Sequence, residues 1–506
     1  MKSYNFKAYV DLLEAKNLVK ESSKQEEEQI IKGLTYNSKA ANKDTLFVCK
    51  GASFKKEYLK EALSLGASSY VSEEKYDLEE EVPYIIVTDI RKAMAALADL
   101  FYNSPQNQLK IIGIGGTKGK TTTAFYTKAI LDEYAKSLGE KPCGILSSIS
   151  TYDGKSTEVS HNTTPEAMEV YRHLHNAVES GLKYMVMEVS SQALKYGRVL
   201  GLTFFAGVFL NISEDHISPI EHKDFQDYFE SKMLMFSQTN HAVVNKNIDY
   251  LNEVLAYSKR ARDVMTFTTD EKDRDADYIA YDIKKQAIGS SFMVEGKEVK
   301  GEFSLSMPGI FNVDNALAAI SAVSLLKVPV EVIKKGLQGA KVKGRMETFH
   351  SEDEKIIGIV DYAHNKLSFE KLFSSLKKEF PDYHITAVFG CPGGKAFGRR
   401  KEMGTIAGKY ADDIILTADE PGFESVAAIS GEISPYIEEA GCPYVMIEDR
   451  GEAIRSAIMK AQGKTLVVAA GKGHEGSLKI KDQYVDTPSD IEYMEMYLSE
   501  YNNKRG

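Results

Sequence analysis

The sequence predicts an α/β protein of three domains. Its 506 residues suggest about three domains, at roughly 100–200 residues per domain. Apolar strands alternate with helices along most of the chain, which is typical of parallel sheets covered by helices. A glycine-rich turn follows one of these strands directly and leads into a helix. We expect the domains at residues 1–104, 105–342 and 343–506.

Composition and charge exclude several classes of protein. Hydrophobic residues make up 43% and charged residues 27%, so the chain can bury large cores. The net charge of −10 argues against a general binder of nucleic acid or membrane surfaces. The N-terminus does not resemble a signal peptide, and no run approaches the roughly 18 apolar residues that span a bilayer. The four cysteines form no CxxC pair and fit a reducing compartment. We expect a cytoplasmic monomer with small-molecule partners.

In the first domain, strands are predicted at Thr45–Cys49 and Tyr84–Asp89 because both runs are apolar and short. Helices are predicted at Lys56–Leu65 and Arg91–Tyr102, the second of which is rich in alanine and leucine. The polar segment Asn103–Gln108 carries a proline and is a candidate linker.

The two later domains repeat the alternation of strand and helix. The second contains three apolar strands, a strand-rich insertion at about residues 275–307, and an apolar helix at Asn312–Leu326. The third begins near Gly339–Gly344 and is of Rossmann type. The strands of the second domain are Leu109–Gly115, Tyr184–Val189 and Ala206–Leu210; those of the third are Ile356–Tyr362, Ile385–Gly390, Asp413–Ala418 and Thr465–Ala470.

The segment Gly113–Thr123, GIGGTKGKTTT, lies between a strand and a helix and is predicted to bind phosphates. Small residues let backbone N–H groups face the phosphates, and a helix N-terminus adds positive potential. Lys120 would contact β- and γ-phosphates, and the Thr121 hydroxyl would bind Mg²⁺. Ile114 departs from the general GxxxxGK[ST] pattern, but the flanking strand and helix argue against a chance glycine turn.

Three further residues are candidates for metal chemistry. Glu188 ends an apolar strand and is placed to hold Mg²⁺, although many strands end in an exposed acid. His216 follows another strand, but a lone histidine in a loop is more often unrelated to function. Lys232 lies on the apolar face of a predicted helix, at i, i+3, i+4, i+7 spacing. Such a lysine usually extends its amine to solvent; a desolvated amine could instead react with CO₂ to form a carbamate that binds Mg²⁺.

Several downstream segments follow strand ends, where open α/β sheets bind ligands. Asn312 and Asn315 begin a helix and could read an adenine edge or simply cap the helix. We expect the remaining segments to converge on one crevice between domains: Arg345, Asp361–His364, the basic loop Cys391–Lys401, Thr417–Glu424 and Ala470–Gly476.

Read in order, ten motifs resemble those of the Mur ligases, the ATP-dependent enzymes that form peptide bonds in bacterial cell-wall synthesis. The resemblance covers nearly the whole chain. The motifs are GTKGKTT (Gly116–Thr122), TTPE (Thr163–Glu166), MEVSSQA (Met187–Ala193), NISEDH (Asn211–His216), SKMLMF (Ser231–Phe236), GIFNVDNALAA (Gly309–Ala319), KGRME (Lys343–Glu347), VDYAH (Val360–His364), TADEP (Thr417–Pro421) and GKGHE (Gly471–Glu475).

The resemblance implies a uridine-nucleotide domain, a central ATPase-like domain and a C-terminal Rossmann-like domain. It also implies that ATP phosphorylates the D-glutamyl carboxylate of UDP-N-acetylmuramoyl-L-alanyl-D-glutamate and that an amino acid then attacks the acyl phosphate. By the same resemblance, Thr121 and Glu188 hold one Mg²⁺, and Glu188, His216 and carbamylated Lys232 hold a second. Lys120 completes this catalytic set.

The resemblance also implies which residues bind the substrates. ATP is expected to contact Gly116, Thr117, Lys118, Gly119, Lys120, Thr121, Thr122, Asn312, Asn315, Arg345 and Asp361. The UDP-muramoyl dipeptide is expected to contact Ser38, Thr163, Thr164, Ser190, Gln192 and Arg198. The amino-acid substrate is expected to contact Lys395, Asp419, Glu420, Gly471 and Glu475.

Departures from the family pattern indicate the amino acid. Diaminopimelate-adding members carry Asp-Asn-Pro-Arg where this chain has Asp419-Glu420-Pro421-Gly422, so the arginine that would pair with a distal carboxylate is missing. The acidic groups there, with Glu424 and Glu475, suit a distal ammonium and favour L-lysine. Lys395 replaces an arginine of many members and keeps the charge without the bidentate fork.

Other functions stay open at this point. The same chemistry could serve ornithine or meso-diaminopimelate, and a non-catalytic or regulatory ATP-binding paralogue would need no buried lysine at position 232. A folylpolyglutamate synthetase shares the ATPase core but lacks the first domain. In that domain, Asn37-Ser38-Lys39 stands where relatives often have Asp-Ser-Arg, which weakens the assignment of individual uridine contacts.

Overall fold

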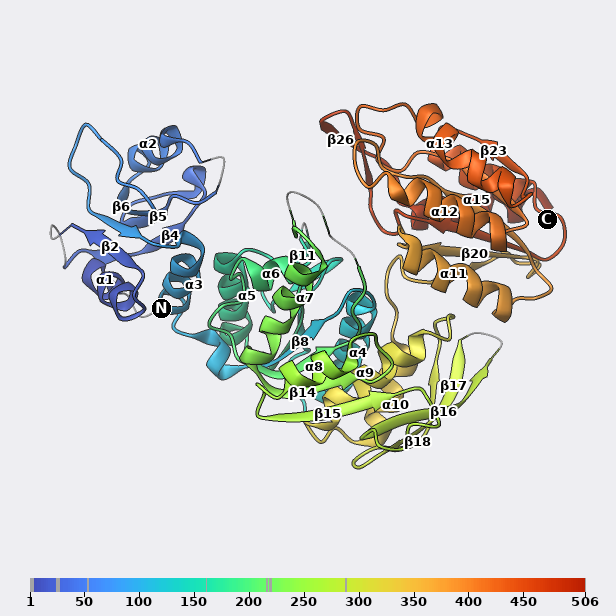
Figure 1. The fold of residues 1–506 in the computed structure, drawn as a ribbon, viewed down its shortest axis with the longest axis horizontal. Helices are drawn as coiled ribbons and strands as arrows, with labels where there is room; N and C mark the ends of the chain where they lie inside the picture. The colour runs from blue at the N-terminus through green and yellow to red at the C-terminus, as the bar shows by residue number, and fades with distance from the viewer. Residues whose placement is uncertain are drawn as a thin grey trace. The chain divides into compact units, whose positions relative to one another are not determined.

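The computed structural model describes residues 4–23, 28–51, 54–160, 162–214, 217, 221–286 and 289–505. Figure 1 traces the helices and strands along the chain. The chain divides into two compact units. The first comprises residues 1–268, 275–277 and 318–332, and the second comprises 269–274, 278–317 and 333–506. Helices α9 (Asn312–Ser324) and α10 (Val330–Gly339) run across the division. Among the described helices, none is both long and apolar enough to cross a membrane.

The N-terminal part of the first unit is a small sheet with helices, as the sequence predicts. Its strand order is β2-β7-β6-β5-β4, parallel except for β2. The elements are β1 (Tyr4–Asn5), α1 (Phe6–Ala15), β2 (Val19–Ser22), β3 (Ile30–Ile31), β4 (Gly33–Thr35), the 3₁₀ helix η1 (Ser38–Ala40), β5 (Thr45–Val48), α2 (Lys56–Ser64), β6 (Ala67–Ser72), β7 (Tyr84–Val87) and α3 (Ile90–Phe101).

The rest of the first unit is a doubly wound sheet in the order β11-β10-β9-β12-β8-β13-β14-β15, parallel from β9 to β15. Its inner strands are buried along nearly their whole length, which explains their continuous apolar runs. The elements are η2 (Pro105–Gln108), β8 (Lys110–Gly115), α4 (Lys120–Ser137), β9 (Gly144–Leu146), β10 (Ser150–Tyr152), β11 (Thr157–Val159), α5 (Ala167–Glu179), β12 (Tyr184–Glu188), α6 (Ser191–Lys195), β13 (Phe204–Phe209), α7 (Phe225–Met233), η3 (Leu234–Gln238), β14 (Thr239–Asn245), α8 (Leu251–Ser258) and β15 (Asp263–Thr268).

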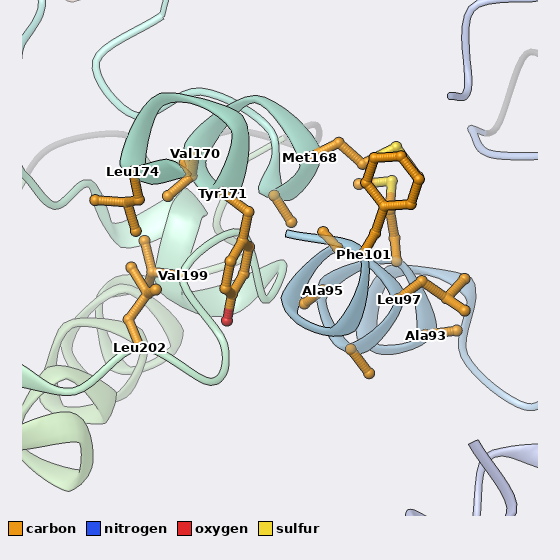
Figure 2. Close-up of a cluster of buried hydrophobic side chains, with 14 of the residues drawn as sticks. Ala93, Ala95, Leu97, Phe101, Met168, Val170, Tyr171, Leu174, Val199 and Leu202 are labelled. Atoms are coloured by element: carbon orange, nitrogen blue, oxygen red, sulfur yellow. The ribbon is translucent and has the colours of Figure 1, made fainter. Parts of the chain in front are cut away.

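One hydrophobic core joins these two parts of the first unit. In Figure 2, Phe101 of α3 lies beside Met168 of α5, and Leu97 and Tyr171 belong to the same buried cluster. The segment predicted as a linker forms η2, in which Pro105 is buried and the Gln106 amide donates to Asp99 at 2.8 Å. Gln106 is therefore packed inside the unit, whereas Asn107 and Gln108 are exposed.

The second unit contains an antiparallel sheet and a Rossmann-like sheet. The first is the predicted strand-rich insertion, β16 (Tyr278–Lys285), β17 (Ser290–Gly296) and β18 (Lys300–Leu305). The second has the order β19-β20-β24-β21-β22-β23, parallel except for β19. β25 (Ser477–Ile480) and β26 (Gln483–Asp486) form a separate antiparallel pair. The other elements of this part are β19 (Glu347–His350), β20 (Ile356–Asp361), α11 (Lys366–Glu379), β21 (His384–Phe389), α12 (Gly398–Tyr410), β22 (Asp413–Leu416), α13 (Val426–Glu439), β23 (Tyr444–Met446), α14 (Arg450–Met459), β24 (Thr465–Ala470) and α15 (Asp490–Arg505).

Candidate functional site

The predicted phosphate loop connects β8 to α4. Gly116 has a φ of 146°, and a Cβ there would lie 3.0 Å from the Cβ of Leu210, so glycine fits best. The Lys120 ammonium donates to the carbonyls of Gly116 and Thr117 at 3.0 and 3.1 Å. In the described chain, no side chain caps the start of α4, where Gly119 is the N-cap. The N–H groups of the first helical turn therefore suit an anion.

Asn211 holds this loop from the end of β13. Its Oδ1 accepts from the backbone N–H groups of Thr117 and Lys118 at 3.0 and 2.8 Å, and its Nδ2 donates to the Lys118 carbonyl at 2.9 Å. The hydroxyls of Thr117 and Tyr228 lie 3.0 Å apart. Sequence reasoning included Asn211 in a motif but gave it no role. Its place after a buried strand beside the phosphate loop was the available signal.

The Glu188 carboxylate lies at the end of β12, next to the phosphate loop. It is 1% exposed. Oε2 accepts from the Thr121 hydroxyl at 3.1 Å, and Oε1 accepts from the N–H and hydroxyl of Ser148 at 2.8 and 3.1 Å. The sequence therefore identified two members of this group and missed Ser148.

Hydroxyl and carboxylate oxygens are the ligands that Mg²⁺ prefers. The donors beside the phosphate loop therefore fit this ion. Within the described ranges there is no cluster of three or more His, Cys, Asp and Glu side chains that could hold a metal. The prediction for His216 lies outside the described residues.

Lys232 is buried, as its spacing in the sequence predicts. It lies on α7 and is 3% exposed. Its Nζ donates to the Gly116 carbonyl at 2.7 Å and lies 4.7 Å from the centre of the Tyr228 ring. The two predicted catalytic lysines, Lys120 and Lys232, thus meet at one carbonyl of the phosphate loop.

Three of the residues predicted to hold the muramoyl dipeptide lie together beyond β12. The Thr164 hydroxyl donates to the Glu188 carbonyl at 2.9 Å and accepts from the Ser190 N–H at 3.1 Å. Arg198 donates to the Thr164 carbonyl at 3.1 Å. The neighbouring Thr163 is half-buried, whereas Gln192 donates to Glu221 at 2.9 Å.

Glu166 joins this group to the N-terminal part of the first unit. Its carboxylate pairs with Arg198 at 2.9 Å and with Lys50 at 2.8 Å. Sequence reasoning gave neither Glu166 nor Lys50 a role. The two residues are far apart in the chain, so only the folded structure brings them together.

Ser38 lines a cavity of about 700 Å³ in the first unit. Aromatic and basic side chains share the lining, a combination that suits a stacked base and an anionic group. Tyr36 donates to Glu169 Oε1 at 2.5 Å. The lining also includes Lys39, Lys50, Phe54, Tyr58, Tyr102 and Arg172.

In the second unit, the residues predicted to bind ATP lie in two small groups. The Asp361 carboxylate accepts from the N–H groups of Met346 and Ala363, each at 2.8 Å, and burial raises its pKa. The Arg345 guanidinium lies 4.5 Å from the centre of the Tyr362 ring. Within the described chain, its buried Nε has no hydrogen-bond partner.

The other group is at the start of α9. The Asn315 amide donates to Asn312 Oδ1 at 3.1 Å, and the Asn312 amide donates to the Pro308 carbonyl at 2.7 Å. Sequence reasoning missed Glu379, whose buried carboxylate accepts from the N–H groups of Gly309 and Ile310, each at 3.0 Å. Glu379 therefore fixes the turn that precedes these amides.

The residues predicted to bind the amino acid form a charged cluster at the carboxyl ends of β21, β22 and β24. Lys395 pairs with Glu420 at 3.2 Å, and Lys472 pairs with Glu475 at 2.5 Å. The Lys472 side chain is 3% exposed and also lies 3.6 Å from Glu420. Sequence reasoning missed Lys472 as a partner of the acids.

Asp419 is buried beside this cluster. Burial, followed by the nearby charges of Glu420 and Glu475, raises its pKa to about 6, although Arg450 and Lys472 oppose the shift. A Cβ at Gly471 would lie 3.2 Å from its Oδ2, so glycine allows a close approach. Glu424, which the sequence groups with these acids, instead pairs with buried Arg400 at 2.9 Å.

Comparison with known proteins identifies the family. Residues 114–323 match the model of the Mur ligase middle domain, and residues 344–473 match that of the Mur ligase glutamate ligase domain. The chain belongs to the Mur ligase family. It is therefore a ligase of peptidoglycan synthesis, a class of ATP-using enzymes.

The similar proteins include curated relatives over nearly the full length. The chain is 40% identical to UDP-N-acetylmuramoyl-L-alanyl-D-glutamate–L-lysine ligase of Streptococcus agalactiae, over 92% of each chain. It is 38% identical to UDP-N-acetylmuramyl-tripeptide synthetase of Ligilactobacillus salivarius, over 95% of this chain and 96% of the relative. A solved UDP-N-acetylmuramoyl-L-alanyl-D-glutamate–2,6-diaminopimelate ligase aligns with a TM-score of 0.67 and 23% identity, over 99% of this chain and 100% of its own, which supports the predicted fold.

Proposed function

We propose that this protein adds L-lysine to UDP-N-acetylmuramoyl-L-alanyl-D-glutamate, with conversion of ATP to ADP and phosphate. The observation that carries the proposal is the 40% identity, over 92% of the chain, to a relative named for this reaction. The carboxylates of Asp419, Glu420 and Glu475 support it, because a side-chain ammonium needs acidic partners. We place the reaction in the cytoplasm; the four cysteines are buried free thiols.

The first step is attack of the D-glutamyl carboxylate on the γ-phosphate of ATP. Two anions must approach each other, so the site must supply positive charge. Lys120 lies at the phosphate loop with its ammonium on loop carbonyls, and α4 presents its uncapped N-terminus there. These groups would bind the phosphates and stabilise the negative charge that grows on them during transfer.

We assign two Mg²⁺ to the neighbouring oxygen donors. Thr121 and Glu188 would hold the first, and Glu188, His216 and a Lys232 carbamate formed with CO₂ would hold the second. When bound, these ions neutralise phosphate charge. The burial of Lys232 supports the carbamate, because desolvation favours the neutral amine that reacts with CO₂.

The remaining binding residues are assigned by domain. Residues 1–104 would bind the uridine nucleotide in the cavity lined by Ser38, and residues 105–342 would bind ATP and the muramoyl dipeptide, the latter through Thr163, Thr164, Ser190, Gln192 and Arg198. Residues 343–506 would bind the amino acid. Asn312, Asn315, Arg345 and Asp361 would hold the nucleoside part of ATP.

In the second step, the α-amine of lysine attacks the acyl phosphate. A tetrahedral intermediate forms, and its collapse releases phosphate and leaves the amide. Lys395 would bind the α-carboxylate of lysine, and the acids near Asp419 would bind the side-chain ammonium. Gly422 supplies no cation for a distal carboxylate, which argues against diaminopimelate.

The test is release of phosphate from ATP in the presence of the muramoyl dipeptide and one amino acid. Lysine, ornithine and meso-diaminopimelate are compared in separate reactions. We expect release that depends on lysine and a higher kcat/KM for lysine than for the other two. A preference for ornithine or diaminopimelate would overturn the choice of lysine alone. Absence of release that depends on any amino acid would overturn the ligase proposal and favour a regulatory ATP-binding protein.

A further inference from the structure

The amino-acid cluster contains two lysines that differ sharply in exposure. The Lys472 side chain is 3% exposed, whereas the Lys395 side chain is 62% exposed. Both contact Glu420: Lys472 lies 3.6 Å from Oε1, and Lys395 lies 3.2 Å from Oε2. An exposed ion pair contributes little to stability, while removal of one partner from a buried pair is strongly destabilising. Lys395 is therefore the more easily displaced partner.

The second acid of the cluster is held by inner groups. Glu475 Oε2 pairs with Lys472 at 2.5 Å, and Glu475 Oε1 accepts from the Tyr362 hydroxyl at 2.6 Å. Lys472 also contacts Glu420 Oε1. Inner side chains therefore engage three of the four carboxylate oxygens of Glu420 and Glu475. A cation that enters from solvent therefore meets Glu420 Oε2, which the exposed Lys395 covers.

The backbone around Lys395 is anchored to the neighbouring loop. Gly393 N–H donates to the Glu420 carbonyl at 2.9 Å, and Gly394 N–H donates to Glu424. Gly394 and Ala396 have φ values of 67° and 52°, so both residues beside Lys395 are left-handed. Because the backbone is held on both sides, release of Glu420 requires only rotation of the flexible Lys395 side chain.

We propose that the Lys395–Glu420 ion pair closes the amino-acid site and is exchanged for the two charges of the substrate. The side-chain ammonium of the incoming amino acid replaces Lys395 on Glu420, and the released Lys395 binds the α-carboxylate. The inference rests on the proposed function and deepens it. One ion pair breaks and two form, so the exchange favours α-amino acids with a cationic side chain.

The exchange also explains how a neutral side chain is rejected. A neutral amino acid would break one pair and form one, and Glu420 Oε2 would be left without a cation, because Lys472 contacts only Oε1. The main effect of Glu420 is therefore to weaken the use of amino acids with a neutral side chain. A site that only attracts the ammonium would behave differently, because loss of Glu420 would then weaken lysine and leave a neutral amino acid unchanged.

The experiment compares Glu420→Gln with the unmodified enzyme on lysine and on norleucine, which is lysine without its ε-amine. Phosphate release at saturating ATP and muramoyl dipeptide gives kcat/KM for each. In the variant, binding of lysine no longer breaks the Lys395–Glu420 pair and no longer forms a pair between residue 420 and the ammonium. We expect its kcat/KM to change by less than about threefold, and that of norleucine to rise about tenfold. A tenfold loss for lysine with norleucine unchanged would overturn the exchange.

A charge-reversed double variant, Lys395→Glu with Glu420→Lys, tests whether the pair is merely structural. It keeps opposite charges in contact but presents them to the substrate in the wrong order. We expect a lower thermal midpoint, because the new cation also faces Lys472, and at least about a tenfold loss of kcat/KM for lysine at a temperature where the variant is still folded. Retained use of lysine would overturn the exchange, and Glu438→Gln, at an exposed position of the same domain, is the control.

The two proposals fail in different ways. If the unmodified enzyme shows no lysine-dependent phosphate release, the proposed function is wrong. If it uses lysine but the variants behave as structural changes, only the exchange is wrong.

Discussion

The phosphate loop and the amino-acid cluster are held together in different ways. Around the loop, Lys120, Lys232 and Asn211 all bind main-chain atoms of residues 116–118. In the amino-acid cluster, Lys395, Glu420, Lys472 and Glu475 bind one another through side-chain charges. A binding site that is held through main-chain atoms keeps its shape, which suits a ligand that stays the same. A site held by side-chain charges can change its preference with one or two substitutions.

The largest effect should come from removal of the Lys120 ammonium at the phosphate loop. We expect Lys120→Met to lower kcat about 100- to 1000-fold, because the charge that develops on the phosphates loses its nearest cation. Steady-state phosphate release measures this. Lys128→Met, later on the same helix, is the matched control, and an equal loss in both variants would assign the effect to the helix rather than to the site.

Lys232→Ala should lower activity about 100-fold, because the proposed carbamate ligand disappears. If the carbamate is the working form, added formate or acetate should restore part of the activity, since a small carboxylate can fill the space. The same additives given to the unmodified enzyme control for a general stimulation. Unchanged activity in the variant would refute the role of Lys232.

Asn211→Ala should have a smaller effect, because Asn211 is expected to position the loop rather than touch the phosphates. The substitution removes three hydrogen bonds to Thr117 and Lys118. We expect the KM for ATP to rise about tenfold with less change in kcat. The control is Asn240→Ala at an exposed position of β14, and a fall in kcat with constant KM would contradict a positioning role.

Asp419 should give the smallest effect, a dependence of lysine binding on pH. Its pKa of about 6 lies above the unfolded value of 3.8, so the fold favours the neutral carboxyl. That contribution to stability is present below about pH 4 and is lost as the pH rises to about 6. Lysine binding depends on pH in the opposite direction. It strengthens as the pH rises, because the ionised Asp419 carboxylate attracts the ammonium.

Calorimetry should therefore show the Kd of lysine rising about three- to fivefold as the pH falls from 7.5 to 5.5. In Asp419→Asn, this part of the dependence should vanish, with weaker binding at pH 7.5. An identical pH profile in both proteins would mean that Asp419 does not face the ammonium.

Much of the fold could be predicted from local pattern. Runs such as Tyr184–Glu188 are buried on both faces, so their uninterrupted apolar sequence identifies them as inner strands. The burial of Lys232 could be predicted from helical spacing, which places it on the apolar face of α7. Asn103–Gln108 was predicted as a linker because the segment is polar and carries a proline. Within it, Gln106 is buried and donates to Asp99, a contact that composition does not reveal.

The site was predictable where its residues belong to ordered motifs, as Lys120, Thr121 and Glu188 do. Their missing partners reach the site through the topology of the sheet. Ser148 follows β9 and Asn211 follows β13, so each meets the phosphate loop only because their strands flank β12 and β8. Lys472 was visible within a motif, but its pairing with Glu420 requires neighbouring strand ends to meet.

The continuous core between α3 and α5 sets a limit on modularity. A chain cut near residue 104 would expose the faces of both helices to water, including Leu97, Phe101, Met168 and Tyr171. An exchange of the first hundred residues with a distant relative would therefore have to carry a matching surface of α5 with it. Recombination at this border should therefore keep the packed pair of α3 and α5 together rather than exchange the N-terminal segment alone.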